Sequence, residues 1–289
     1  MAKRLVILDA GHAKTTAGKR SADGSLLEWE FNNDMQKKLK KRLEQLGITV
    51  RLTNPTPDQG SEVSLANRCK RANEFWVNEG KPNCLFISLH ANAAGATSAR
   101  GVEVFNAANA SAKSINAAKK ICNNIYKDVY AIDKGFKNRG QKSYNYYVIR
   151  YTNMPAVLIE YAFYSNSEDL KILKNKRALL CEATVKGICE YFNIAYKTSS
   201  EVVTESVNTD KVPSTCKPWK NGTYNVKVKV KASTLNVRQG RPGSDKYNNI
   251  IGTLKRGEIV TVGYCLNGWF GVLINGRQGF ISGDYVVLA

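Results

Sequence analysis

Only two imidazole side chains occur in this 289-residue chain, and each follows a short apolar run. His12 ends the segment LVILDAGH, and His90 lies within LFISLHANA. Imidazole is the commonest nitrogen ligand of zinc, and a hydrolytic zinc site uses about three protein ligands and leaves one position open for water. The two histidines therefore predict a metal site whose third ligand is a carboxylate.

A carboxylate follows a third apolar run, since Glu160 ends the segment AVLIE. In open α/β sheets ligands bind beyond the carboxyl ends of the strands, so we expect His12, His90 and Glu160 to meet at one sheet edge. A lone histidine is more often a satisfied core or loop residue, and Glu160 alone could cap a helix or pair with Arg139 or Arg150. Their shared placement favours the functional interpretation.

The elements that would hold these residues alternate between strand and helix patterns over the first two-thirds of the chain. This alternation predicts an α/β layer structure with a largely parallel sheet. Period-2 or continuous apolar runs predict strands at residues 4–8, 48–53, 85–89, 101–105, 146–150 and 156–160. Apolar residues at helical spacing predict helices at residues 28–46, 64–80, 115–129 and 169–192.

The composition changes after Tyr196. Residues 197–220 are rich in Ser, Thr and Val, contain two prolines and carry no sustained apolar pattern, so they predict a linker. Short alternating segments separated by Gly, Pro and Asn turns follow, and they predict a small all-β domain over residues 221–289. Residues 1–196 are then the catalytic domain.

Charge limits the classes of partner. Lys and Arg number 43 against 24 Asp and Glu, a net charge of +19 that predicts an anionic partner such as nucleic acid, acidic lipid or an acidic wall polymer. The basic residues are spread along the chain without a nucleic-acid motif, so we favour a wall polymer and expect no nucleic-acid binding. No run approaches the roughly 20 apolar residues of a membrane span, so we expect no membrane insertion.

The cysteines and the first segment bear on the compartment. Seven cysteines without CxxC spacing indicate neither a disulfide framework nor a thiolate zinc site, so folding in a reducing cytosol is the simpler interpretation. The opening MAKRLVILDAGH leads directly into His12, which is not the pattern of a cleavable signal peptide. We therefore expect cytoplasmic synthesis and release by another route.

Several spaced motifs resemble the zinc-dependent N-acetylmuramoyl-L-alanine amidases of the amidase-3 family, over about the first 190 residues. They are LDAGH from Leu8, LLEWEFNND from Leu26, SLANRCKRAN from Ser64, SLHANA from Ser88, GVEVF from Gly101 and MPAVLIEYAFYSNSED from Met154. The resemblance implies a twisted mixed sheet with helices on both faces. It also implies a zinc ion held by His12, Glu28 and His90, with water in the fourth position and Glu160 as the catalytic carboxylate.

The chemistry that the resemblance implies is hydrolysis of the amide between the muramic acid lactyl group and the L-alanine of the stem peptide. Zinc would activate the water and polarise the carbonyl, and Glu160 would take a proton from the water and pass it to the leaving amine. The sequence departs from the family at Ala13 and Lys14, after His12, and at Ala162, where glycines are common. Glu30 lies two residues after Glu28, so the alignment decides which of them is the ligand.

The C-terminal segment resembles a bacterial SH3-like (SH3b) domain. The matching pieces are TLNVRQGRPG from Thr234, IGTLKRGEIVTV from Ile251, NGWFGV from Asn267 and GRQGFISGDYV ending at Val286. The resemblance implies a small barrel that targets the enzyme to the bacterial wall. Tyr247, Trp269 and Tyr285 are candidates for stacking on sugars or peptides, although packing within the barrel is the favoured role of Trp269.

A wall amidase joined to a wall-binding module fits a bacteriophage endolysin, made without a signal peptide in the host cytoplasm and active on the wall after release. The basic charge suits the peptidoglycan of a Gram-positive wall rich in anionic polymers. A host autolysin or sporulation amidase of the same chemistry is one alternative. A non-catalytic peptidoglycan-binding protein is another, although a pure binder needs neither a metal site nor Glu160.

Overall fold

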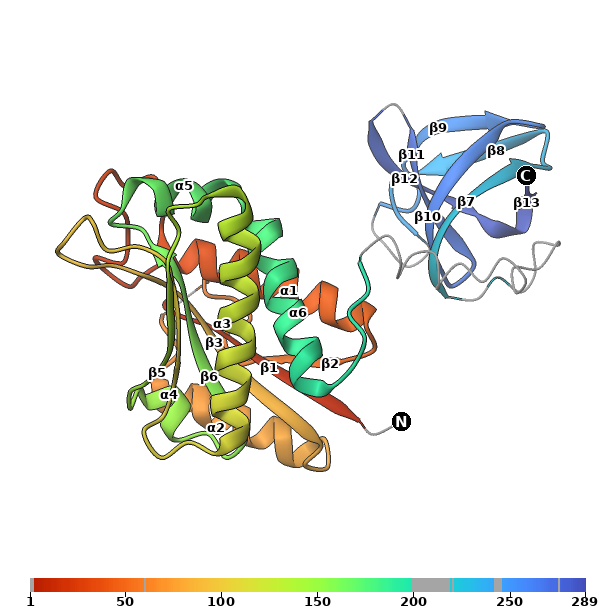
Figure 1. Cartoon of the computed structure of the whole chain (residues 1–289). Coiled ribbons are helices and arrows are strands. Elements are labelled where there is room, and N and C mark those ends of the chain that lie inside the picture. Colours follow the sequence, from red (N-terminus) through yellow and green to blue (C-terminus); the bar gives the residue numbers. More distant parts are fainter. Residues whose placement is uncertain (1–2, 60, 199–218, 220, 242–245, 275) are drawn as a thin grey trace. The chain divides into compact units, whose positions relative to one another are not determined.

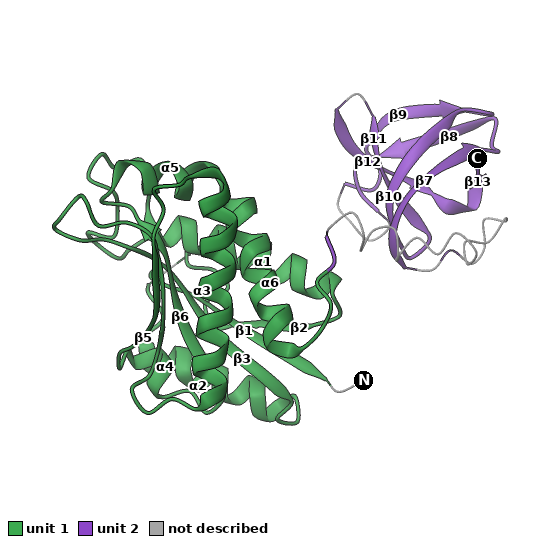
Figure 2. Cartoon of the chain, in the orientation of Figure 1, with its two compact units in different colours: residues 1–196 green, residues 197–289 purple. Residues whose placement is uncertain are grey.

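The computed structural model describes residues 3–59, 61–198, 219, 221–241, 246–274 and 276–289 (Figure 1). The chain divides into two compact units, Met1–Tyr196 and Lys197–Ala289 (Figure 2). Nearly all of the predicted linker, residues 197–220, lies outside the described residues, as does Cys216. None of the helices in the described ranges is long and apolar enough to span a membrane.

A mixed six-stranded sheet forms the centre of the first unit, in the order β2-β1-β3-β6-β4-β5. Strands β1, β2, β3 and β6 are parallel, whereas β4 runs antiparallel to β6 and carries β5 parallel to itself. The strands are β1 Arg4–Ala10, β2 Thr49–Leu52, β3 Asn83–Asn92, β4 Val102–Asn106, β5 Asn138–Ser143 and β6 Ala156–Phe163. The predicted α/β fold with a mostly parallel sheet is confirmed.

Helices cover both faces of this sheet (Figure 1). They are α1 Glu28–Gln45, α2 Leu65–Asn78, α3 Ala112–Ile132, α4 Tyr147–Arg150, α5 Ser167–Asn175 and α6 Arg177–Phe192. Side chains alternate between the faces along β1, so Val6 and Leu8 join the core beneath α1, α3 and α6, whereas Leu5 and Ile7 join the core beneath α2 and α4.

The prediction of a strand at Tyr146–Arg150 is wrong, because the segment forms the short helix α4. Its amides bond to carbonyls four residues earlier, Arg150 N to Tyr146 O and Tyr151 N to Tyr147 O, both at 3.1 Å. Val148 and Ile149 are both buried in the core that includes α2, which strand alternation would not allow for adjacent residues. A short apolar run does not distinguish these two structures.

Two other elements differ from the sequence pattern. The single helix predicted at residues 169–192 is two helices, α5 and α6, which meet at the non-helical Lys176 (φ −122°, ψ 26°). Strand β5 has the polar sequence NRGQKS and was not predicted. It lies at the sheet edge and pairs only with β4 among the described strands, so it needs no apolar alternation.

A buried ion pair ties the parallel strands to α2. Arg68 Nη1 lies 2.9 Å from Asp9 Oδ1, and both side chains are at most 2% exposed. Thr53 and Ser88 donate to the same carboxylate from the end of β2 and from β3. Burial alone would raise the pKa of Asp9, but Arg68 and these donors outweigh it and hold the pKa below its usual value.

The second unit is an antiparallel sheet of seven strands, as the short alternating segments predict. The strands are β7 Gly222–Val230, β8 Thr234–Arg238, β9 Ile250–Lys255, β10 Ile259–Leu266, β11 Trp269–Ile274, β12 Arg277–Ser282 and β13 Val286–Leu288. Its core contains Trp219, which packs edge-on against Phe270 at 4.8 Å and donates its indole N–H to Gly283 O.

We predict that Arg68→Met lowers the free energy of unfolding of the first unit by about 3–5 kcal/mol, because it leaves the Asp9 carboxylate buried without its cation. Lys70→Met, an exposed change on the same helix, is expected to cost less than about 0.5 kcal/mol. Urea unfolding of the full chain, followed by circular dichroism at a helical wavelength, measures both.

The effect of Arg68→Met on the free energy of unfolding is expected to depend on pH. In the wild type the Asp9 pKa is lowered, so its stabilisation is complete above the unfolded value of about 3.9 and is lost as the pH falls through the folded pKa. In Arg68→Met burial raises the Asp9 pKa instead. The loss of unfolding free energy relative to the wild type is therefore largest near neutral pH and shrinks as the pH falls. A difference in unfolding free energy between variant and wild type that does not change with pH contradicts the role of this ion pair.

Candidate metal and catalytic site

Four elements deliver the residues that the sequence singles out. His12 lies just beyond β1, His90 lies within β3, Glu28 is the first residue of α1 and Glu160 lies within β6. Both β3 and β6 run further than predicted, so His90 and Glu160 are not beyond the strand ends. They are paired in register instead, which puts both side chains on the same face of the sheet.

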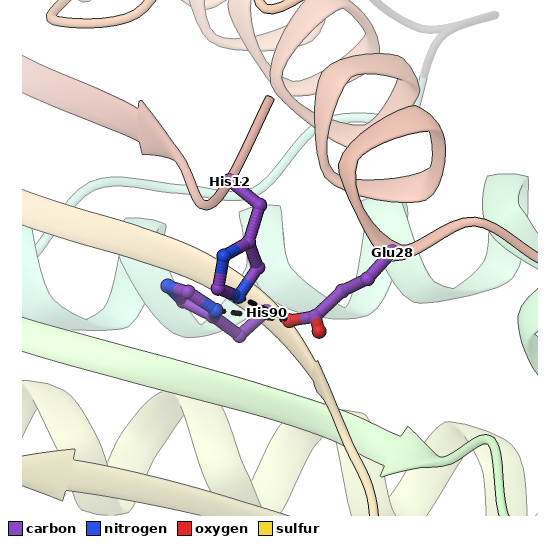
Figure 3. A group of neighbouring side chains, drawn as sticks. All are labelled: His12, Glu28 and His90. Atoms are coloured by element: carbon purple, nitrogen blue, oxygen red, sulfur yellow. Dashed lines mark hydrogen bonds and ion pairs between the residues drawn. The ribbon is translucent and has the colours of Figure 1, made fainter. Parts of the chain in front are cut away.

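The structure brings His12, Glu28 and His90 together (Figure 3). Glu28 Oε1 lies 3.0 Å from His90 Nδ1 and 3.4 Å from His12 Nε2. The three candidate ligand atoms all lie within 4.8 Å of one another. Ligand atoms at about 2.1 Å from a tetrahedral zinc ion are roughly 3.4 Å apart, so this group fits such an ion.

Glu28 is ionised in this setting. Burial would raise its pKa, but the two imidazoles that it contacts lower the pKa far below its usual value. Its position in the first turn of α1 adds the favourable field of the helix N-terminus. Glu30, the alternative in the same turn, instead forms an ion pair with Arg177 at 2.9 Å, so Glu28 is the residue that joins the histidines.

His12 has a left-handed backbone, with φ at +61°, which is unusual for a residue other than glycine. Polar side chains hold this turn. Asn54 Nδ2 donates to His12 O at 3.0 Å and to Ala10 O at 2.9 Å, and Asn32 Nδ2 donates to Gly11 O at 3.0 Å. Such backbone strain persists only where the surroundings fix it, and it concentrates at functional sites.

The position of the His90 ring requires a glycine at residue 11. A Cβ atom at this position would lie 2.1 Å from Cε1 and 2.4 Å from Nε2 of His90, far inside van der Waals contact. The Gly11 amide also donates to Leu89 O at 3.1 Å, which keeps the turn close to β3. The glycine therefore allows the His90 ring to lie directly against the backbone that carries His12.

Glu160 has an environment unlike that of Glu28. Its Oε2 atom is buried and has no hydrogen-bond partner within the described residues. Burial raises its pKa well above the usual value, and the nearby charges of Glu28 and Glu103 raise it further. A carboxyl group with a raised proton affinity beside a candidate metal site is suited to accept and return a proton.

Comparison with known proteins places the chain in a family. The family description N-acetylmuramoyl-L-alanine amidase, amidase-3, matches residues 6–190. The chain belongs to this family. Among relatives, the endolysin of Bacillus phage SPP1 is 31% identical over 199 residues, which cover 67% of this chain and 68% of that protein.

Bacterial amidases are also similar to this member of the amidase-3 family. LytC of Bacillus subtilis is 30% identical and covers 58% of the chain, and the probable cell wall amidase LytH of Staphylococcus aureus is 30% identical and covers 66%. The chain spans only 31% of LytC and 59% of LytH. These relatives therefore support the family membership of the first unit.

Solved structures agree with the family fold. An N-acetylmuramoyl-L-alanine amidase of Clostridium difficile 630 covers 67% of this chain and 98% of its own, with 26% identity and a TM-score of 0.59. The catalytic domain of CwlV from Bacillus (Paenibacillus) polymyxa covers 66% and 99%, with 29% identity and a TM-score of 0.54. Ala13 and Ala162, two of the positions where the chain departs from the family, are buried.

Sequence reasoning missed one carboxylate beside the candidate site. Glu103, in β4, is in register with Glu160 and therefore shares its face of the sheet. Its oxygens accept from Arg139 Nε and Lys142 Nζ, both at 2.6 Å, and from Asn92 Nδ2 at 2.7 Å. Burial acts to raise the Glu103 pKa, but these cations lower it overall. An acidic residue inside the buried run GVEVF was the available signal.

We predict that Gly11→Ala weakens metal binding about tenfold or more, because the added methyl group displaces the His90 ring. Gly95→Ala is the matched control, since a Cβ atom there meets nothing within 4 Å. Metal content after dialysis against a graded chelator measures the effect, and circular dichroism checks folding. Equal metal retention by the two folded variants contradicts the role assigned to Gly11.

Proposed function

We propose that the first unit is a zinc-dependent amidase that hydrolyses the bond between N-acetylmuramic acid and L-alanine in peptidoglycan. The observation that carries this proposal is the cluster of two half-buried histidines, His12 and His90, around the buried Glu28 in an amidase-3 chain. Glu160 adds a carboxyl group of raised proton affinity on the same sheet face as His90. A metal site and a proton acceptor are the two requirements of metal-assisted amide hydrolysis.

The metal ligands would be His12 Nε2, His90 Nδ1 and Glu28 Oε1, a set of two imidazoles and one carboxylate typical of catalytic zinc sites. When bound, zinc supplies the Lewis acidity that polarises an amide carbonyl and makes water a nucleophile near neutral pH. The buried Glu28 carboxylate fixes both rings, which reduces the reorganisation needed on binding. Asn54 and Asn32 keep the His12 turn in place.

The proton-transfer step is assigned to Glu160. Its carboxylate takes a proton from the attacking water and then delivers that proton to the nitrogen of the departing L-alanine. The raised pKa makes the carboxylate a better base than an exposed glutamate. The water oxygen forms the new C–O bond as the amide C–N bond breaks, and the second water proton passes from the new carboxylic acid to the released amine. The products are a muramic acid carboxylate and a stem peptide with a free ammonium group.

The second unit is proposed to be an SH3b-like module that binds the wall. A groove of about 480 Å³ lies on it, lined by residues that include Arg238, Tyr247, Trp269, Asp284 and Tyr285. The Tyr247 and Trp269 rings meet edge-on at 5.5 Å, and the Arg238 guanidinium lies 4.4 Å from the Tyr247 ring centre. Aromatic rings with polar groups beside them suit a sugar or peptide ligand of the wall.

An endolysin is the proposed biological role, acting on a Gram-positive wall after release from the cytoplasm. The similarity to the endolysin of Bacillus phage SPP1 and the net charge of +19 support it, since anionic wall polymers attract a basic protein. The similarity to LytC and LytH keeps a bacterial wall amidase as the alternative. A non-catalytic binder is disfavoured because it needs no Glu160.

Mass spectrometry of purified Gram-positive peptidoglycan after digestion tests the activity, with a chelator and with zinc added back. We expect free stem peptides that start with L-alanine, lost with the chelator and restored by zinc. New sugar reducing ends or cut cross-links would mean that another bond is cleaved. No release from several walls would favour the non-catalytic binder.

The same assay separates metal binding from proton transfer. Glu160→Gln is expected to retain zinc and lose cleavage by about 10²- to 10⁴-fold, since the amide cannot accept the proton. His90→Ala is expected to lose both zinc and cleavage, because it removes a ligand. If the glutamine variant cleaves at near the wild-type rate, Glu160 is not the base.

Wall binding by the second unit is tested with Tyr285→Ala, which removes an exposed ring that is 51% accessible from the edge of the groove. We expect binding to purified walls, measured by co-sedimentation of the full chain, to fall about 3- to 10-fold. Leu273→Ala is the control, because Leu273 is 72% exposed and does not line the groove. Equal losses in the two variants exclude the groove as the binding site.

A further inference from the structure

The second ring nitrogen of His12 faces a carboxylate outside the ligand group. His12 Nε2 lies 3.4 Å from Glu28, whereas His12 Nδ1 lies 3.8 Å from Oε1 of Glu62. Glu62 stands in the loop before α2, two residues ahead of its N-cap Ser64. The residue is remote in sequence from His12, and neither the apolar pattern nor the matched motifs point to it.

Glu62 is itself held by side chains on two sides. Thr16 Oγ1 donates to Glu62 Oε2, and the same hydroxyl accepts from the amide of Ala13, next to His12. Arg68 Nη2 lies 3.4 Å from Glu62 Oε1. Arg68 is almost fully buried and is fixed by Asp9, so it provides a rigid positive anchor. The carboxylate is therefore preorganised beside the imidazole.

His12 needs such a restraint more than His90 does. His90 lies within β3, and its ring packs against Gly11, so strand and backbone limit its orientation. His12 lies beyond the end of β1, in a left-handed turn. A neutral imidazole carries its proton on either nitrogen, and only the nitrogen without the proton can bind a metal ion. A carboxylate beside Nδ1 stabilises the tautomer with its proton there, which is the tautomer that metal binding through Nε2 requires. It offsets the opposite preference that Glu28 creates at Nε2.

We propose that Glu62 is a positioning residue for the metal site, which orients the His12 imidazole and stabilises the tautomer with its proton on Nδ1, so that Nε2 can bind the metal. The inference rests on the proposed zinc-dependent function. Glu62 is not a ligand in this arrangement, because the ligand group consists of His12, Glu28 and His90 among the residues that the structure describes. In this arrangement Arg68 holds Glu62, and Glu62 in turn orients His12.

Zinc affinity provides a readout that does not depend on activity. Glu62→Gln keeps the size of the side chain and removes its charge, and we expect it to weaken zinc binding about 10- to 100-fold in chelator competition. Glu30→Gln is the matched control, because it removes one charge from the same neighbourhood but contacts Arg177 and no imidazole. We expect its zinc affinity to stay within about twofold of wild type.

The tautomer of His12 provides the second readout. The chain has only two histidines, so ¹⁵N-histidine labelling gives two sets of ring signals, which His90→Ala assigns. In the zinc-free protein Glu28 competes for the proton at Nε2, so the readout is a change in population. We expect Glu62→Gln to lower the fraction of His12 that carries its proton on Nδ1, relative to the wild type. A merely structural role for Glu62 would change the free energy of unfolding and leave the tautomer populations of the folded protein unaltered.

The outcomes separate this inference from the proposed function. If the wild type binds zinc tightly and the two glutamine variants match it, Glu62 has no positioning role while the zinc site stands. Equal weakening in Glu62→Gln and Glu30→Gln indicates a general charge effect and also overturns the inference. Failure of the wild type to bind zinc overturns both the inference and the proposed zinc dependence.

Discussion

The cost of burying ionised carboxylates governs the organisation of the first unit. Four carboxylates at the sheet are largely removed from solvent. They are Asp9 in β1, Glu103 in β4, Glu160 in β6 and Glu28 at the start of α1. An isolated buried charge is so unfavourable that it must find a partner or take up a proton. The partner of each carboxylate therefore indicates its role.

Three of these carboxylates have evident partners, and each has a different kind. Asp9 pairs with Arg68, which fastens α2 to the sheet. Glu103 pairs with Arg139 and Lys142, so its single negative charge offsets part of the positive charge of these two cations. Glu28 contacts two imidazoles, which can exchange that contact for a shared cation. The first two ion pairs are structural, whereas Glu28 and the two imidazoles could bind a metal ion in place of one another.

Glu160 is the exception that gives the arrangement its chemistry. Burial and the acidic neighbours Glu28 and Glu103 raise the Glu160 pKa, so this carboxylate has a higher proton affinity than an exposed glutamate. The register of β6 with β3 and β4 fixes this geometry, because His90, Glu160 and Glu103 lie opposite one another in adjacent strands. A slip of one residue would turn Glu160 to the other face of the sheet.

Much of this site could be predicted from the chain, for a physical reason. Apolar runs mark parallel strands, whose carboxyl ends share one sheet edge, so His12, His90 and Glu160 could be grouped without a structure. His90 and Glu160 lie within longer strands instead, and the strand register puts them on one face. Glu28 needed the family motif, because acidic residues in a first helical turn are common for electrostatic reasons alone. Strand β5 and helix α4 were missed because polar edge strands and single helical turns leave little periodicity.

Glu62 could not have been found in the same way, because its role arises from tertiary contacts alone. The residue meets His12 and Thr16 across a loop and meets Arg68 from one turn of α2. Arg68 thus contacts two carboxylates, one that holds the strands together and one that faces a candidate ligand. Because the same guanidinium serves both, the stability of the sheet and the orientation of His12 are coupled. A change that loosens Arg68 acts on the fold through Asp9 and on the metal site through Glu62.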